Sequence, residues 1–189
     1  MIPVAFIRHA PTTWNAERRL QGRTDVDLSE EGRRAAAAWR IPEALADFEV
    51  WASPLKRTRS TAALLGLQPR FDERLIESSW GEWEGRTLVE LGRQPGFRHV
   101  EQRGLDLAAP GGGETVRQVQ ARLLDWLGSL TRPALAITHN GVLRAAYSLA
   151  TGWTMVAEAP QKMDAASAHL YAWDGTRLTL DRLNLPLAP

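Results

Sequence analysis

Three short, continuous apolar runs constrain the fold of this chain more than any other feature of its sequence. They are "IPVAFI" at residues 2–7, "EVWAS" at 49–53 and "ALAIT" at 134–138. An uninterrupted apolar run is typical of a strand that is covered on both faces, because a half-exposed strand alternates apolar and polar residues. Each run leads into a stretch with helical character. Strands that alternate with helices predict an α/β fold with a mostly parallel sheet between layers of helices.

The helices and the end of the chain can be placed from caps, stops and spacing. Ser29 is a cap for the first helix, and two glutamates in its first turn suit the positive end of the helix dipole. After 168–173, a turn at Asp174-Gly175 leads to 177–183, which predicts a terminal hairpin. The predicted helices cover residues 30–39, 55–65, 116–132 and 140–151 and end before or at Gly66, Pro133 and Gly152.

The chain of 189 residues suits one compact domain, 1–189. The stretch at about 86–113 is irregular, with Gly, Pro and scattered charges, and we expect it to form a short cap or lid. It ends in "PGGGET", where successive glycines allow positive φ angles before the next helix.

Charge and composition exclude several classes of protein. Lys and Arg number 23 against 22 Asp and Glu, no stretch concentrates the basic residues, and we therefore expect no nucleic-acid partner. The absence of cysteine excludes disulfides, thiolate catalysis and cysteine-bound metal, and a cytoplasmic location is the expectation. No signal-peptide pattern and no apolar run of about 20 residues is present, so no membrane association is expected. The sequence predicts no particular oligomeric state.

Two of the three apolar runs are followed by histidine. His9 comes after Arg8 at the end of the first run, and His139 directly follows the third. Because the carboxyl ends of parallel strands share one edge of the sheet, these residues and Arg57, after the second run, can converge there. Two guanidiniums match the oxygens of a phosphate monoester, and a neutral imidazole can attack phosphorus. The alternative is that both histidines only cap strands, and arginine is abundant enough for chance proximity.

Six motifs in order favour the chemical interpretation. They are "RHAPTTWN", "GRTDVDLSEEG", "ASPLKRTRSTA", "RLIESSWGEWEG", "PGGGET" and "THNG". In this order they resemble the histidine phosphatase superfamily, also called the phosphoglycerate mutase-like family, from residue 4 to about 144. The resemblance implies a three-layer α/β/α sandwich, phosphoryl transfer through a phosphohistidine, and no metal or other cofactor.

The resemblance also implies roles for particular residues. His9 resembles the nucleophile, and Arg8 and Arg57 the arginines that bind the transferring phosphoryl group. His139 resembles the second histidine, which stabilises the phosphoryl oxygens.

The general acid has three candidates in "RLIESSWGEWEG", and the register of the family favours Glu77. Such an acid must lie near the ester oxygen and be protonated for part of the time, which burial promotes. We expect Glu82 and Glu84 to fix the loop or to face water.

Five further positions bear on the substrate. Asn15 and Gln21 match positions that line the phosphate and substrate mouth, although a loop-fixing hydrogen bond is an equally good interpretation for both. Ala10 and Pro11 stand where Gly and Glu are frequent in the family, and Asn140 replaces the first glycine of a usual His-Gly-Gly. These departures affect the choice of substrate and leave the nucleophile in place.

The sequence thus predicts a metal-independent phosphomonoesterase that acts on a small phosphorylated metabolite. A cofactor-dependent phosphoglycerate mutase with the same residues is the alternative, but only residues 78–113 separate Glu77 from Glu114, which leaves little room for the longer insertion with which family mutases close the site. A noncatalytic phosphate-binding module is the alternative from another class.

Overall fold

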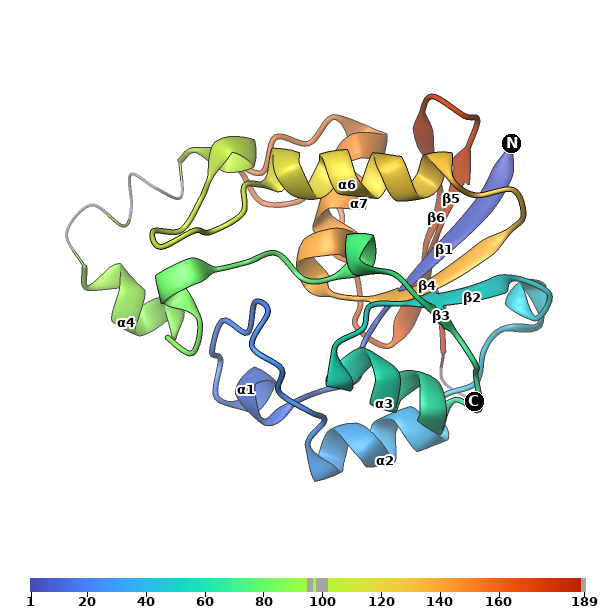
Figure 1. Ribbon diagram of the computed structural model, residues 1–189, viewed down its shortest axis with the longest axis horizontal. Coiled ribbons are helices and arrows are strands. Elements are labelled where there is room, and N and C mark those ends of the chain that lie inside the picture. The colour runs from blue at the N-terminus through green and yellow to red at the C-terminus, as the bar shows by residue number, and fades with distance from the viewer. Residues whose placement is uncertain (95–96, 98–101, 188–189) are drawn as a thin grey trace.

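The computed structural model describes residues 1–94, 97 and 102–187, and a six-stranded sheet forms its centre (Figure 1). The strand order is β3-β2-β4-β1-β5-β6. The strands are β1 (Ile2–Arg8), β2 (Glu49–Ala52), β3 (Arg70–Phe71), β4 (Ala134–Thr138), β5 (Ser167–Trp173) and β6 (Leu178–Pro186).

The sheet is parallel on one side and antiparallel on the other. β1 pairs with β4, and β2 with β3 and β4, in parallel, whereas β1–β5 and β5–β6 are antiparallel pairs. The three predicted strands and the terminal hairpin are therefore confirmed, although β2 is only half-buried while β1 and β4 are buried along most of their length. β3 was not predicted, because a strand of two exposed residues carries no periodicity in the sequence.

The helices also follow the sequence pattern, with small differences at their ends. The Ser29 hydroxyl accepts a hydrogen bond from the Gly32 amide at 3.0 Å, as the cap prediction requires. The helix that Ser29 caps ends at Ala38, one residue earlier than predicted. The helix after Thr115 ends at Gly128, well before Pro133. The α-helices are α1 (Thr13–Ala16), α2 (Glu30–Ala38), α3 (Lys56–Leu64), α4 (Leu88–Gly92), α6 (Val116–Gly128) and α7 (Asn140–Thr151), and the 3₁₀ helices are η1 (Glu43–Leu45), η2 (Glu73–Leu75), η3 (Gly81–Trp83) and η4 (Gly104–Asp106).

Helices cover both faces of the sheet, as Figure 1 shows, with α6 and α7 on one side and α2 and α3 on the other. Successive side chains of β1 point to opposite faces of the sheet and so contact both helix layers. Val4 and Phe6 pack in the cluster with α6 and α7, whereas Ala5 and Ile7 pack in the cluster with α2 and α3. A continuous apolar run is required because both faces are buried. The predicted three-layer α/β/α architecture is confirmed.

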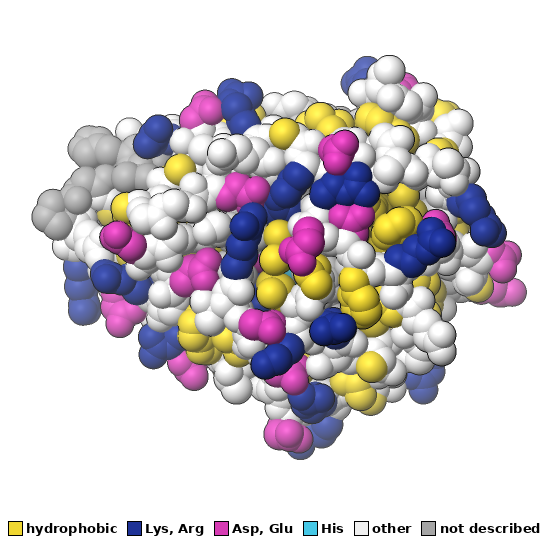
Figure 2. All heavy atoms as spheres, viewed as in Figure 1, with side chains coloured by type: hydrophobic (Ala, Val, Ile, Leu, Met, Phe, Trp, Pro, Cys, Tyr) yellow, Lys and Arg dark blue, Asp and Glu magenta, His cyan; other side chains and the backbone are white. Residues whose placement is uncertain are grey.

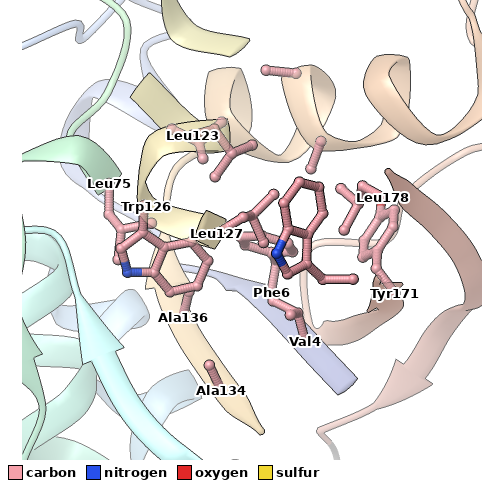
Figure 3. Packing of buried hydrophobic residues seen from close by; sticks show 14 of the residues in the cluster. Val4, Phe6, Leu75, Leu123, Trp126, Leu127, Ala134, Ala136, Tyr171 and Leu178 are labelled. Atoms are coloured by element: carbon pink, nitrogen blue, oxygen red, sulfur yellow. The ribbon is translucent and has the colours of Figure 1, made fainter. Parts of the chain in front are cut away.

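Aromatic rings fill the core under α6 (Figure 3). The ring of Phe6 lies 5.8 Å from that of Trp126 and 5.6 Å from that of Tyr171, in tilted and edge-to-face arrangements. Burial of one such side chain contributes about 1.5–3 kcal/mol to folding. This packing fixes β1, the strand whose end carries Arg8 and His9.

The stretch predicted as a cap or lid contains α4 and η4. Its residues 95–96 and 98–101 lie outside the described part of the chain. Trp83, Leu91, Phe97 and Ala109 form a small apolar cluster of their own, separate from the two clusters at the sheet. The prediction of one domain with a short cap stays a prediction.

The surface carries charges of both signs. Basic and acidic side chains alternate over the face seen in Figure 2, in line with a formal net charge of +1. Across the described ranges, no helix is both long and apolar enough to cross a membrane.

Candidate active site

Two neighbouring parallel strands bring the two histidines together. β1 and β4 are in register to their last residues, Arg8 opposite Thr138, and the His9 amide donates to the Thr138 carbonyl at 2.9 Å. The imidazole rings of His9 and His139 consequently lie 5.3 Å apart between centroids. The predicted convergence at the carboxyl edge of the sheet is therefore observed for this pair.

The hydrogen bond of His9 determines which of its nitrogens is available. Nδ1 lies 2.7 Å from the Ala10 carbonyl oxygen. Because a carbonyl oxygen only accepts, Nδ1 carries the hydrogen in the neutral ring and Nε2 keeps a lone pair. Burial, then the charges of Arg8 and Arg57, hold the pKa of His9 well below its usual value of 6.5. His9 is thus a neutral imidazole with a nucleophilic Nε2 at neutral pH.

His139 is completely buried and is held at both nitrogens. The Arg57 Nε donates to Nδ1 at 3.1 Å, so Nε2 carries the hydrogen and faces the Ser53 Oγ at 2.7 Å. Burial and then the charge of Arg57 lower its pKa well below 6.5, which keeps the ring neutral. Ser53 was not predicted as a site residue, although it ends the second apolar run. His139 therefore holds the Arg57 side chain in place through the hydrogen bond at Nδ1.

Arg57 is oriented by three hydrogen bonds that use three of the five N–H groups of a guanidinium. Besides the bond to His139, Nη1 donates to the Thr24 carbonyl at 2.9 Å and Nη2 to the Gly22 carbonyl at 2.7 Å. One N–H on each terminal nitrogen is left, which matches two oxygens of a phosphoryl group. Burial lowers the pKa of Arg57, and the opposing influence of Glu77 comes second.

Glu77 is a buried carboxyl group that two backbone amides fix in place. The Ser78 amide donates to Oε1 at 2.8 Å and the Gly141 amide to Oε2 at 3.2 Å. A Cβ atom on Gly141 would lie 2.2 Å from Oε1, so only glycine permits this close approach. α7 therefore holds the carboxyl group through the glycine of the "THNG" motif.

The other two acid candidates are placed as the sequence predicts. Glu84 accepts hydrogen bonds from the amides of Arg23, Thr24 and Trp80 at 2.9, 2.9 and 3.1 Å, and so fixes the loop. Glu82 is exposed. Neither carboxylate lines the pocket described next.

The site contains one pocket of about 390 Å³. Arg8 and His9 line it, and burial lowers the pKa of Arg8 more than Glu77 raises it. His139 is not among the lining residues. The remaining lining residues are Asn15, Arg19, Leu20, Gln21, Gly22, Arg57, Glu77, Ser78, Trp80, Leu88, Gly104, Leu107, Glu114, Val116, Asn140, Gly141, Arg144 and Met155.

Asn15 and Gln21 both reach the pocket but differ in their contacts. The Asn15 Oδ1 accepts from the Thr12 amide at 2.9 Å and the Thr12 hydroxyl at 3.1 Å, which closes a capping box at α1. The loop-fixing interpretation therefore describes its oxygen. The buried Oε1 of Gln21 has no hydrogen-bond partner within the described residues, so it is available to a ligand.

The three departures from the family pattern have distinct consequences. The Ala10 amide donates to the Thr61 hydroxyl at 3.0 Å, so this turn is fixed by α3. The Pro11 carbonyl accepts from the Ser29 amide at 3.0 Å, which joins the turn to α2. Asn140 is exposed and adds an amide to the pocket wall.

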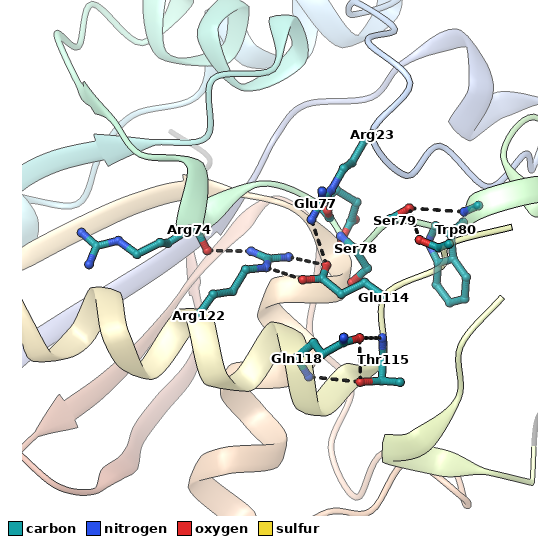
Figure 4. Close-up of polar contacts among 12 residues, drawn as sticks. Arg23, Arg74, Glu77, Ser78, Ser79, Trp80, Glu114, Thr115, Gln118 and Arg122 are labelled. Atoms are coloured by element: carbon teal, nitrogen blue, oxygen red, sulfur yellow. Dashed lines mark hydrogen bonds and ion pairs between the residues drawn. The ribbon is translucent and has the colours of Figure 1, made fainter. Parts of the chain in front are cut away.

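Glu114 connects two arginines beside the segment that carries Glu77 (Figure 4). Its Oε1 accepts from the Arg122 Nε at 2.9 Å, and its Oε2 from the Arg122 Nη2 at 3.0 Å and the Arg23 Nη2 at 3.3 Å. Residues far apart in the sequence form this bridge, so no local pattern could have revealed it.

The same three residues also bind backbone carbonyl groups on both sides of Glu77. Arg122 donates to the Arg74 carbonyl at 2.6 Å, Arg23 to the Glu77 carbonyl at 3.4 Å, and the Glu114 amide to the Ser79 carbonyl at 2.9 Å. The bridge fixes the loop, and with it the position of the Glu77 carboxyl group.

Among the described residues, no group of three or more His, Cys, Asp or Glu side chains is placed to hold a metal ion. The positive charge of the pocket comes from arginines. Metal-independent chemistry stays a prediction.

The similarity of this chain to known proteins shows the family to which it belongs. The model of the histidine phosphatase superfamily (branch 1) matches residues 4–186. A metal-independent phosphoserine phosphatase of Arabidopsis thaliana is 33% identical over 76% of this chain and 66% of its own. A probable phosphoglycerate mutase, GpmB, of Salmonella paratyphi C is 31% identical over 84% of this chain and 79% of its own. The crystal structure of a phosphoglycerate mutase from Thermus thermophilus superposes with a TM-score of 0.78 at 33% identity, over 97% of this chain and 99% of that one. The chain belongs to the histidine phosphatase superfamily.

Proposed function

We propose that this protein is a metal-independent phosphomonoesterase that acts on a small phosphorylated metabolite through a phosphohistidine. One observation carries the proposal. The Nε2 of His9 keeps a lone pair because Nδ1 is bound to the Ala10 carbonyl, and it lies in a pocket that Arg8 and Arg57 also line. A nucleophile beside two guanidiniums matches a phosphate group, whose charge the arginines neutralise as it is attacked.

In the first step, the Nε2 of His9 attacks phosphorus and an N–P bond forms. The bond between phosphorus and the ester oxygen breaks, and Glu77 gives its proton to that oxygen, so a neutral alcohol leaves. The free N–H groups of Arg57, together with Arg8, bind the phosphoryl oxygens during the transfer. His139 supports this step through its hydrogen bond to Arg57.

In the second step, water attacks the phosphohistidine. The Glu77 carboxylate takes a proton from the water, a new P–O bond forms and the N–P bond breaks. Inorganic phosphate leaves, and both His9 and Glu77 return to their starting protonation states. No electron acceptor and no metal ion enters this balance.

Hydrolysis of p-nitrophenyl phosphate by the wild type, His9→Gln and His169→Gln tests the proposal. Both histidines are buried, but only His9 lines the pocket. We expect turnover by the wild type and His169→Gln and none by His9→Gln, with acid-labile phosphate trapped only on the proteins that turn over. Normal turnover by His9→Gln would show a different nucleophile. Phosphate binding without any turnover by the wild type would favour the noncatalytic module.

A phosphoglycerate mutase is the second candidate, because two of the similar proteins are described as such. The chain between Glu77 and Glu114 is short, which favours access of water to the phosphohistidine. With 3-phosphoglycerate and a trace of 2,3-bisphosphoglycerate, we expect inorganic phosphate to form faster than 2-phosphoglycerate. Faster formation of the isomer would support the mutase.

A further inference from the structure

The pocket that contains His9 is also lined by Arg144, a residue of α7. Arg144 lies one helical turn after Asn140, so both side chains share one face of the helix. Both residues line the active-site pocket, and so do the apolar side chains of Leu107 and Met155. These four residues also border the next hollow in the surface. Arg144 therefore stands in the wall that the pocket shares with this second hollow.

Among the described residues, no carboxylate forms an ion pair with Arg144. Burial lowers its pKa, and no acidic group raises it in return. The carboxylates that line the pocket have other partners: Glu77 binds two backbone amides, and Glu114 binds Arg122 and Arg23. A partly buried positive charge of this kind lowers the stability of the folded protein unless an anion binds to it.

A tryptophan fixes the guanidinium of Arg144. Its carbon Cζ lies 4.6 Å from the centre of the Trp153 ring. Trp153 is itself held, because its Nε1 donates to the Ala157 carbonyl at 3.0 Å and its ring packs edge-on to Tyr147 at 5.9 Å. Stacking occupies the flat face of a guanidinium and leaves the N–H groups at its edge, which match a carboxylate in two parallel hydrogen bonds. The site is therefore oriented before a ligand binds.

We propose that Arg144 binds a carboxylate on the alcohol part of the substrate, so that the enzyme selects phosphate monoesters that carry a carboxylate. This inference rests on the proposed phosphomonoesterase function and adds the class of substrate. The Asn140 amide, one turn before Arg144, adds a donor to the same wall.

The length of α7 between the two sites limits the size of the substrate. Arg144 follows His139 by five residues, which places its Cα about 7.5 Å further along the helix axis at ~1.5 Å per residue. His9 and Arg144 line the same pocket of about 390 Å³, so a small metabolite can place its phosphate at His9 and its carboxylate at Arg144. The apolar side chains of Leu107 and Met155 cover the space beside it.

The test compares two esters that differ in one group. 3-Phosphoglycerate carries a carboxylate where glycerol 3-phosphate carries a hydroxymethyl group. We expect the wild type to hydrolyse the former with the higher kcat/KM. Arg144→Gln should lose about 10- to 100-fold on 3-phosphoglycerate, the effect of removing a hydrogen-bonded ion pair. It should change little on glycerol 3-phosphate and p-nitrophenyl phosphate. Arg144→Lys, which keeps the charge without the planar fork, should fall between the two.

Arg34→Gln is the matched control, because Arg34 is exposed on α2, on the other side of the sheet. A wild type without preference between the two esters, or an equal loss on all three substrates in both Arg144 variants, would overturn the inference while the phosphomonoesterase function stands. Failure of the wild type to hydrolyse any ester would overturn that function. In that case, calorimetric binding of the two esters to the wild type and the Arg144 variants decides the carboxylate site, and equal affinities would refute it.

Discussion

Replacing Glu77 by Gln removes a proton donor and nearly preserves the shape of the side chain. The hydrogen bonds of Glu77 indicate how much stability the substitution should remove. Oε1 and Oε2 each accept one backbone amide hydrogen bond, at 2.8 Å from Ser78 and 3.2 Å from Gly141. Glutamine keeps one oxygen, so one of these bonds is lost and the new NH₂ group faces a backbone N–H, which costs about 1–3 kcal/mol. For a chain of this size, each kcal/mol lowers the melting temperature by about 2–4 °C, and the variant still folds.

The effect of Glu77→Gln on catalysis should depend on the leaving group. An alkyl alcohol leaves poorly without a proton, whereas p-nitrophenolate is stable as an anion. We therefore expect kcat/KM to fall by about 10²–10⁴-fold on glycerol 3-phosphate, the range for general acid catalysis, and by much less on p-nitrophenyl phosphate. The parameter kcat/KM reports the steps up to phosphohistidine formation, so slow hydrolysis of the intermediate does not hide the effect when that formation is irreversible.

Glu82→Gln is the control for this experiment, because Glu82 belongs to the same loop and is exposed. It should leave both rates close to those of the wild type. Equal losses on both substrates in Glu77→Gln would refute the assignment of the acid. A selective loss in Glu82→Gln would move the assignment to that residue.

Three further predictions concern the neighbourhood of the site, acid stability and metal ions. Gly141→Ala should lower kcat/KM on alkyl phosphates far more than on p-nitrophenyl phosphate, because its Cβ would lie 2.2 Å from the Glu77 Oε1 and must displace the acid; equal activity on both would contradict this close packing. Burial lowers the pKa of His169 from 6.5 to about 4. Between these two pH values the unfolded chain binds a proton that the folded chain does not, so the free energy of unfolding should fall as the pH drops from 6.5 towards 4. The melting temperature of His169→Gln should therefore depend less on pH in this range, and an unchanged pH dependence would exclude the residue as a cause. Exhaustive chelation with EDTA should leave hydrolysis intact because arginines supply the positive charge, whereas a loss that a divalent ion restores would overturn the metal-independent mechanism.

The sequence by itself determined the layers of the fold and the position of the two histidines. A strand that is buried on both faces must be apolar throughout, so the three apolar runs were visible without any partner. Their polar ends were visible for the same reason. Parallel strands end at one edge of a sheet, and for this reason His9 and His139 could be expected to meet although 129 residues separate them in the numbering.

The roles of Asn15 and Ser53 depended on contacts that the sequence does not display. Asn15 matched a family position at the substrate mouth, yet its oxygen closes the capping box with Thr12. Ser53 carried no motif of its own, and it becomes a partner of His139 only because β2 lies beside β4. The order of the strands decides the contact between Ser53 and His139, and strand order is a property of the folded sheet.

Only the tertiary structure decided how the pocket is supported and where it leads. Glu114 meets Arg23 because the loop after β1 folds against the start of α6, and Arg144 stacks on Trp153 because the chain turns back after α7. Local propensity acts over a few residues, whereas these contacts join segments that only core packing brings together. The sequence therefore determined which residues end the strands, and packing determined which charges remain without a partner.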